Sequence, residues 1–300
     1  MIFHQAAKAA RLLCLFRLLS IFPLPVAYRL AGLVGRLDAA FGNAYLSAIA
    51  SGMSRVRTDC FALPPYRIAG HVSMHSMMMA REVIDAYITG RRGGHLLGEI
   101  SSLSGHEIIR DSLDAGQGVI VLVSHYSRLN MVACSLGHAG IPTGIITQCV
   151  DRRNRLLDWV DRAYLSGKLE RYHRVTRGPL VTLEDNLRPI YRALLEGQAV
   201  IMLMDAFHPR FRRFVSYPFL GGSISLPAGA LRLAGKTGAS MVYGVARESG
   251  WHVDVEIRPL PGEPGDAMSA AVEELERDVM ERPWEWWQWF NIREIWQKQV

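Results

Sequence analysis

Along the second half of the chain, short runs of uninterrupted apolar residues alternate with segments whose apolar residues recur at the spacing of a helix. The clearest runs are GVIVLV (118–123), TGIITQCV (143–150) and AVIMLMDAF (199–207), and helical patterns separate them. Strands that lack an apolar–polar alternation are buried on both faces, which is typical of a parallel sheet covered by helices on each side. The pattern therefore predicts an α/β fold: a single domain with a mostly parallel central sheet flanked by helices.

Two later segments predict an antiparallel hairpin. SMVYGVARESG (240–250) and WHVDVEIRPL (251–260) are β-rich and meet at the turn Glu248-Ser249-Gly250. We expect this hairpin at the sheet edge. Between the second and third apolar runs, NRLLDWVDRAYLSGK (154–168) predicts a further helix, which leads through YHRVTR (172–177) into the next one.

The first forty residues are more apolar than an ordinary soluble segment. A membrane-spanning helix needs about 20 predominantly apolar residues, but prolines break this segment and arginines interrupt it, namely Pro23, Pro25, Arg11, Arg17 and Arg29. The pattern favours a helical segment at the membrane surface, with arginines reaching the headgroups and leucines in the acyl boundary. A true span and a core helix remain alternatives. We therefore divide the chain into a membrane-associating segment (1–40) and an α/β domain (41–300).

Charge and cysteine usage narrow the classes of partner. The formal net charge is +6, which favours an anionic partner: membrane phosphate, nucleic acid or an acidic carrier protein. The four cysteines are scattered and form no C-x-x-C pair, which argues against a disulfide framework and for a reducing compartment. His71 and His75 share a helix face but lack a third ligand, so we expect no metal site.

His125 ends the first apolar run, where a strand gives way to a helix. Sites in open α/β sheets gather at the carboxyl ends of strands, and free backbone N–H groups at the start of the next helix suit an anion. A histidine there could act as a general base, because its ordinary pKa lies near the working pH. A histidine that merely ends a strand in a turn is the alternative. Asn130 stands five residues later, where a carboxylate would support the imidazole.

The stretch from His125 to Asn130 resembles the histidine–four residues–acid signature of the lysophospholipid acyltransferase superfamily. More narrowly, the chain resembles the lipid A biosynthesis late acyltransferases, the lauroyl and myristoyl transferases. The likeness covers nearly the whole chain and includes RLLSIFPLPVAYRLAGLVGRL (17–37), ALLEGQAVIMLMDAFHP (193–209) and the tail PWEWWQWFNIREIW (283–296).

The resemblance implies an acyltransferase of the inner membrane, peripheral or anchored by its N-terminus, on the cytoplasmic face. Such an enzyme moves a fatty acyl group from an acyl-carrier-protein or coenzyme A thioester to a hydroxyl or amine of a lipid or lipid-like acceptor. The thioester is a co-substrate, and no metal or redox cofactor and no nucleic acid is implied. His125 would be the general base, Asp205 matches an aspartate that closes a later strand, and Tyr217 and Phe219 fall on an acyl or acceptor pocket segment.

Two positions depart from the family pattern. The motif acid is Asn130, and the arginine after the second strand corresponds to Gln148. An asparagine can orient an imidazole but cannot stabilise an imidazolium, and the equivalent change in the serine-protease triad costs roughly 10⁴ in rate. The missing charge could come from elsewhere, with Asp205 as the first candidate, or the acceptor could need less help from a base. The third possibility is a relative that binds lipid or acyl carrier without turnover.

Arginines interleaved with aromatic residues offer an anion-binding surface. They occur in RYHRVTR (171–177) and HPRFRRF (208–214), and arginine pairs bidentately with phosphate. Such segments also suit nucleic acid or a solvated loop, but the apolar N-terminus favours lipid or acyl carrier. The predicted catalytic residues are His125 and Asn130; the predicted substrate-binding residues are Gln148, Arg177, Asp205, Arg210, Arg212, Arg213, Tyr217 and Phe219.

Overall fold

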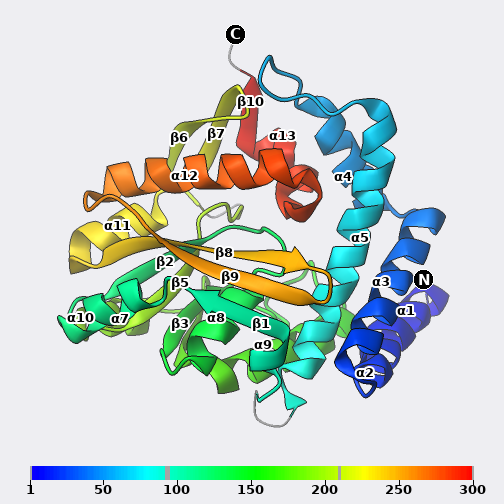
Figure 1. Ribbon diagram of the computed structural model, residues 1–300, viewed down its shortest axis with the longest axis horizontal. Helices are drawn as coiled ribbons and strands as arrows, with labels where there is room; N and C mark the ends of the chain where they lie inside the picture. The colour runs from blue at the N-terminus through cyan, green and yellow to red at the C-terminus, as the bar shows by residue number, and fades with distance from the viewer. Residues whose placement is uncertain (1, 92–94, 209–210, 299–300) are drawn as a thin grey trace.

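A mostly parallel sheet forms the centre of the protein. The computed structural model describes residues 2–91, 95–208 and 211–298, and in these ranges seven strands follow the order β1-β9-β8-β2-β5-β3-β4 (Figure 1). Among the described strands of this seven-stranded sheet, only the β8–β9 pair is antiparallel. This confirms the expected sheet. Its strands are β1 (Ser101–Ser104), β2 (Val119–Val123), β3 (Thr143–Thr147), β4 (Arg177–Thr182), β5 (Ala199–Leu203), β8 (Ser240–Ser249) and β9 (His252–Pro259).

The hairpin expected at the sheet edge is present as β8 and β9, but its edge position was wrong. The short strand β1 pairs in parallel with β9 and lies outside it. Its sequence SSLS is mostly polar and half exposed, so it carries no apolar run that would reveal a strand. β4 was also missed, because its first residues belong to a segment that reads as a connection between helices.

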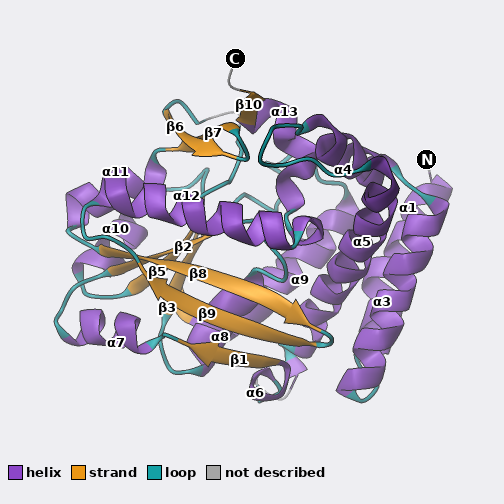
Figure 2. Cartoon of the chain, turned by 45° about the horizontal axis from the view of Figure 1, so that its top comes forward, coloured by secondary structure: helices purple, strands orange, loops and turns teal. Residues whose placement is uncertain are grey.

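Helices cover both faces of the sheet (Figures 1 and 2). Side chains of β2 alternate between the two faces: Ile120 and Leu122 join one hydrophobic core, and Val119, Val121 and Val123 join the other. The first core contains residues of α10, α11 and α12, and the second contains residues of α3, α8 and α9. The bounds are α3 (Leu24–Phe41), α7 (Glu107–Asp114), α8 (Asn130–His138), α9 (Trp159–Thr176), α10 (Arg188–Leu195), α11 (Gly229–Thr237) and α12 (Pro264–Glu281).

α9 begins later and runs further than the sequence pattern predicts. The side chain of Asp158 accepts a hydrogen bond from the backbone N–H of Asp161 at 2.9 Å, and Asp161 completes a capping box. This cap fixes the start of the helix, because it satisfies N–H groups that have no partner within the helix.

A second, smaller sheet lies beside α12 and closes one end of the molecule (Figure 2). It contains β6 (Phe214–Phe219), β7 (Gly222–Pro227) and β10 (Trp296–Lys298) in the order β10-β7-β6. Before β10, the tail forms the short helices η3 (Pro283–Glu285), η4 (Trp287–Asn291) and α13 (Ile292–Ile295).

The N-terminal helices form a layer against one side of the domain, where α3 packs along α5 (Figures 1 and 2). At Gly35 a Cβ atom would lie 2.3 Å from the carbonyl oxygen of Ser76, so only glycine permits this close approach. No helix in the described ranges is long and apolar enough to cross a bilayer. The layer consists of α1 (Ile2–Ala9), the π-helix η1 (Ala10–Leu15), α2 (Phe16–Leu19), α3, α4 (Ala44–Arg55) and α5 (Pro65–Ile88), and α6 (Leu97–Ile100) follows it.

Candidate active site

His125 and Asp205 meet at the carboxyl edge of the central sheet. β2 and β5 pair in parallel in a register that joins Val123 to Leu203. The backbone N–H of Met204 donates to the carbonyl oxygen of Val123 at 2.8 Å, so the pairing continues past the strand ends. The same offset brings position 125 opposite position 205. Strand pairing therefore delivers both side chains to the edge where α/β proteins place their sites.

The Asp205 carboxylate is fully buried, and both of its oxygens accept hydrogen bonds. Its side chain has 0% exposure, while that of His125 has 24%. Nδ1 of His125 lies 2.8 Å from Oδ1, the backbone N–H of His125 donates to the same oxygen at 2.8 Å, and Nε1 of Trp286 donates to Oδ2 at 3.0 Å. These donors replace the water that a buried carboxylate loses, so the group is held in one orientation.

The contacts of Nδ1 select one tautomer of His125. Nε2 of Gln288 lies 3.0 Å from Nδ1, but it also donates to the backbone carbonyl of Asp205 at 2.6 Å. The Gln288 carbonyl accepts from Nδ2 of Asn291 at 2.9 Å, which fixes the amide. The stronger partner of Nδ1 is the carboxylate, because charge-assisted hydrogen bonds are stronger than neutral ones. Nδ1 therefore carries the hydrogen. Nε2, which has no hydrogen-bond partner among the described residues, keeps its lone pair.

The tryptophan-rich tail folds over the loop that carries His125. The backbone N–H of Trp287 donates to the carbonyl of His125 at 2.8 Å, and that of Ser127 donates to the carbonyl of Glu285 at 2.7 Å. Nε1 of Trp287 also donates to the carbonyl of Ser127 at 2.9 Å. Trp286 and Trp289 are fully buried, so these two tryptophans pack inside the protein. The contacts also hold Ser127 at a left-handed φ of 51°.

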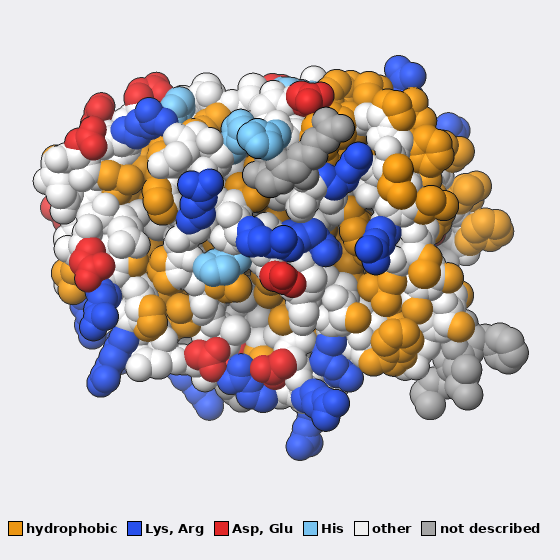
Figure 3. Space-filling view, turned by 90° about the horizontal axis from the view of Figure 1, so that it is seen from below, with side chains coloured by type: hydrophobic (Ala, Val, Ile, Leu, Met, Phe, Trp, Pro, Cys, Tyr) orange, Lys and Arg blue, Asp and Glu red, His pale blue; other side chains and the backbone are white. Residues whose placement is uncertain are grey.

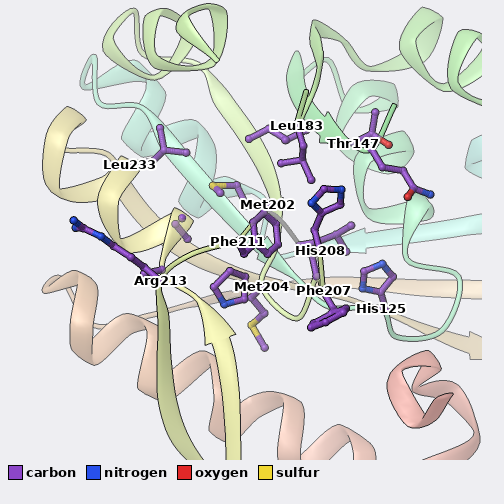
Figure 4. A pocket seen from close by; sticks show the side chains of 18 of the residues that line it. His125, Thr147, Leu183, Met202, Met204, Phe207, His208, Phe211, Arg213 and Leu233 are labelled. Atoms are coloured by element: carbon purple, nitrogen blue, oxygen red, sulfur yellow. The ribbon is translucent and has the colours of Figure 1, made fainter. Parts of the chain in front are cut away.

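His125 opens onto a cavity of about 720 Å³. Figure 4 shows part of its wall, with His125 at one side of the cavity and Met202, Met204 and Phe211 extending away from it. Most of the remaining wall is also apolar, and three arginines complete it. The further apolar lining residues include Ile146, Leu183, Leu187, Tyr191, Phe207, Leu233 and Phe290.

The arginines of the cavity are Arg212, Arg213 and Arg232, and all three are exposed. Within the described part of the chain they form no ion pair. Unpaired guanidinium groups beside an apolar cavity suit a ligand that joins a long apolar chain to an anionic group such as phosphate.

The predicted site residues divide into those near His125 and those away from it. Gln148, Arg212 and Arg213 line the same cavity as His125, and Asp205 lies directly behind the imidazole. Arg177 begins β4 and therefore lies at the amino edge of the parallel strands, away from the cavity. Tyr217 and Phe219 are buried in β6 and do not line the cavity; Phe219 packs on Trp286 instead. Arg210 lies outside the described residues.

Asn130, the first residue of α8, faces a different partner. Its Nδ2 donates to Oε1 of Glu82 on α5 at 2.8 Å. No hydrogen bond joins Asn130 to His125 within the described ranges. The structure therefore supplies a carboxylate to His125 from the neighbouring strand and not from the following helix.

Sequence reasoning missed the tail residues that complete the site. Trp287, Gln288 and Asn291 line the cavity, and Gln288 lies 163 positions beyond His125. The only local signal was the unusual density of tryptophan in this segment. It did not indicate which residues would face the imidazole.

The fold and the site together define an α/β protein with a histidine–carboxylate pair beside a mostly apolar cavity. The comparison with protein families makes this specific. Residues 10–297 match the bacterial lipid A biosynthesis acyltransferase family, and the chain belongs to that family. This confirms the resemblance seen in the sequence and shows an acyltransferase family whose acceptors are lipid-like. A comparison with curated proteins gave no match.

Proposed function

We propose that the protein transfers a fatty acyl group from an acyl-carrier-protein or coenzyme A thioester to a hydroxyl or amine of a lipid or lipid-like acceptor, with His125 as the general base. The observation that carries the proposal is the pairing of buried Asp205 with His125, whose imidazole lines a mostly apolar cavity. Family membership supports the reaction class.

The reaction is an acid–base cycle on one imidazole. Nε2 of His125 removes a proton from the acceptor as its oxygen or nitrogen attacks the thioester carbonyl. The tetrahedral oxyanion collapses, the C–S bond breaks, and the imidazolium returns the proton to the leaving thiolate. Asp205 stabilises the imidazolium, which is the role that an acid at position 130 would otherwise have. The Gln148 amide lines the same cavity and is suited to donate to the oxyanion. The cycle as written requires no metal or redox cofactor.

The cavity accounts for both ends of the acyl donor. Apolar walls around Met202 and Leu233 accept the hydrocarbon chain. Arg212 and Arg213 are placed to bind the phosphate of a phosphopantetheine arm, which acyl carrier protein and coenzyme A share, or a phosphate on the acceptor.

We further propose that α3 holds the protein peripherally on the cytoplasmic face of the inner membrane. α3 has one face buried against α5, whereas its other face exposes Leu33 at 52%, Leu37 at 50% and Phe41 at 87%. Figure 3 shows hydrophobic side chains gathered on the side of the N-terminal helices, with Lys and Arg beside them. An apolar stripe flanked by Arg29 and Arg36 is typical of a helix at an anionic bilayer surface.

The surface after β3 extends this apolar side towards the cavity. Gln148 lines the cavity, and the loop that follows it exposes Leu156 at 91% before reaching Trp159 at 50%. Nε1 of Trp159, the first residue of α9, donates to Oε1 of Gln5 on α1 at 3.2 Å, so the end of this loop adjoins the N-terminal layer. Leucine and tryptophan are favoured at a membrane interface. The arrangement supports a cavity that receives a membrane-borne acceptor.

Thiol release tests the proposal directly. Purified protein is mixed with acyl-carrier-protein and coenzyme A thioesters and with lipids extracted from membranes, and the acylated product is identified by mass spectrometry. We expect release and product formation with wild type, none with His125→Ala, and wild-type rates with His138→Ala, because His138 is exposed at the far end of α8. Retention of the thioester or lipid by wild type without any thiol release would instead indicate a relative that binds without turnover.

A further inference from the structure

We infer that Asn130 is a positioning residue that docks the His125 loop onto α5, and that this position is neutral because Glu82 already supplies the carboxylate there. The inference rests on the proposed function for its kinetic part. It assigns Asn130 to a buried charge network and not to the group that supports the imidazole.

Glu82 lies at the meeting point of three helices. It is 3% exposed and accepts from Nδ2 of Asn130 on α8 at 2.8 Å. It also forms a buried ion pair with Lys168 on α9, which is 9% exposed. The pair is balanced, with one negative and one positive charge and a neutral amide. Asn130 is half-buried, but a carboxylate there would place a second negative charge against the buried Glu82 carboxylate, which is unfavourable.

A second contact one turn further along α5 holds the same loop. The guanidinium of Arg128 makes two hydrogen bonds to Asp85, at 2.7 Å from Nε and 2.5 Å from Nη2, and both side chains are buried. Tyr28 of α3 donates to the same carboxylate at 2.5 Å. Glu82 and Asp85 are three residues apart on α5 and hold Asn130 and Arg128, which are two residues apart. The loop after His125 is therefore fixed at two adjacent points.

These contacts explain why an amide stands at the position of the motif acid. The imidazole of His125 obtains its carboxylate from Asp205 at 2.8 Å, so position 130 is not required for that purpose. The Asn130 amide can donate to Glu82, whereas an ionised aspartate can only accept. The identity of residue 130 is thus coupled to residue 82.

A charge-exchange cycle tests this coupling. The variants are Asn130→Asp, Glu82→Gln and the double variant, and the measurements are the melting temperature, kcat, KM and the pH profile of kcat/KM. We expect Asn130→Asp to lower the melting temperature by several degrees and to lower kcat without moving the pH profile. Glu82→Gln leaves Lys168 without its partner and lowers the melting temperature as well.

In the double variant the carboxylate introduced at position 130 can accept from the amide introduced at position 82 and balance the charge of Lys168. Melting temperature and kcat should therefore recover most of the loss.

Asn186→Asp is the matched control, because Asn186 is exposed and the same change there should leave all four quantities near wild type. The inference is overturned if Asn130→Asp raises kcat or shifts the pH profile whatever residue occupies position 82. It is equally overturned if the two losses in melting temperature simply add in the double variant. The melting data decide this even if no variant turns over a thioester, an outcome that would contradict the proposed function alone.

Discussion

Nδ1 of His125 lies 2.8 Å from Oδ1 of Asp205, a residue 80 positions further along the chain. The two strands that carry them are adjacent and parallel, with position 123 opposite position 203. The carboxylate that supports the imidazole therefore comes from the next strand of the sheet. The asparagine that replaces the expected acid after His125 is consequently compatible with an intact histidine–carboxylate pair.

Asp205→Asn should lower kcat by roughly 10³–10⁴-fold, because an amide cannot stabilise the imidazolium and its NH₂ group would favour the wrong tautomer. Stability should fall by roughly 1–3 kcal/mol, since one of the donors now bonded to the carboxylate would face another donor. Thiol-release kinetics and urea unfolding measure the two effects. Activity close to wild type in a folded variant would show that Asp205 does not support His125.

Arg212→Ala and Arg213→Ala should each raise KM for the thioester donor by roughly 10-fold with little change in kcat, because a charge-assisted hydrogen bond contributes about 1.5–3 kcal/mol. The wild-type KM should rise with ionic strength, and that dependence should be weaker in the variants. Arg188→Ala is the control, since the exposed side chain of Arg188, at the start of α10, does not line the cavity. Unchanged KM values in both variants would exclude these arginines from donor binding.

Leu33→Asp and Leu37→Asp should weaken binding to vesicles of anionic phospholipid by at least about 10-fold each, because burying one leucine side chain contributes roughly 1.5–3 kcal/mol. Co-sedimentation with the vesicles measures the effect. Leu195→Asp serves as the control, because Leu195 is 64% exposed on α10. Equal loss of binding in all three variants would argue that α3 makes no specific membrane contact.

Glu285 should make stability depend on pH. Burial raises its pKa from 4.5 to about 7. Between these values the folded protein holds a proton that the unfolded chain has released, so the free energy of unfolding should fall as pH rises, by at most about 1.4 kcal/mol per pH unit. Glu285→Gln keeps the shape and removes the charge. Urea unfolding from pH 4.5 to 8 should show a flatter dependence for the variant and higher stability than wild type at pH 8. Parallel curves would contradict the prediction.

Many of the strands and helices could be predicted from the sequence, because they depend on local patterns of apolar residues. The runs at β2, β3 and β5 are continuously apolar over a few residues, which is typical of strands buried on both faces. The position of His125 at a strand end followed from the same pattern. By contrast, the polar strand β1 was missed, because pairing with β9 and not its own composition makes it a strand.

In the N-terminal layer too, the sequence predicted the kind of segment, whereas tertiary packing decided which of its faces is exposed. The sequence showed an apolar segment interrupted by arginines and prolines, but not which face of α3 would be covered. Close packing of Gly35 against the carbonyl of Ser76 on α5 decides that, and it leaves Leu33 and Leu37 outside.

The sequence by itself determined the strand–helix alternation, the family and the placement of the candidate base, His125, at a strand end. Only the tertiary structure decided that Asp205 and not Asn130 faces the imidazole, that Asn130 binds Glu82, and that Gln288 completes the site. The reason is physical. A local pattern reports which side chains are buried, whereas a contact between residues 80 or 163 positions apart depends on strand register and on how the tail packs across the sheet edge.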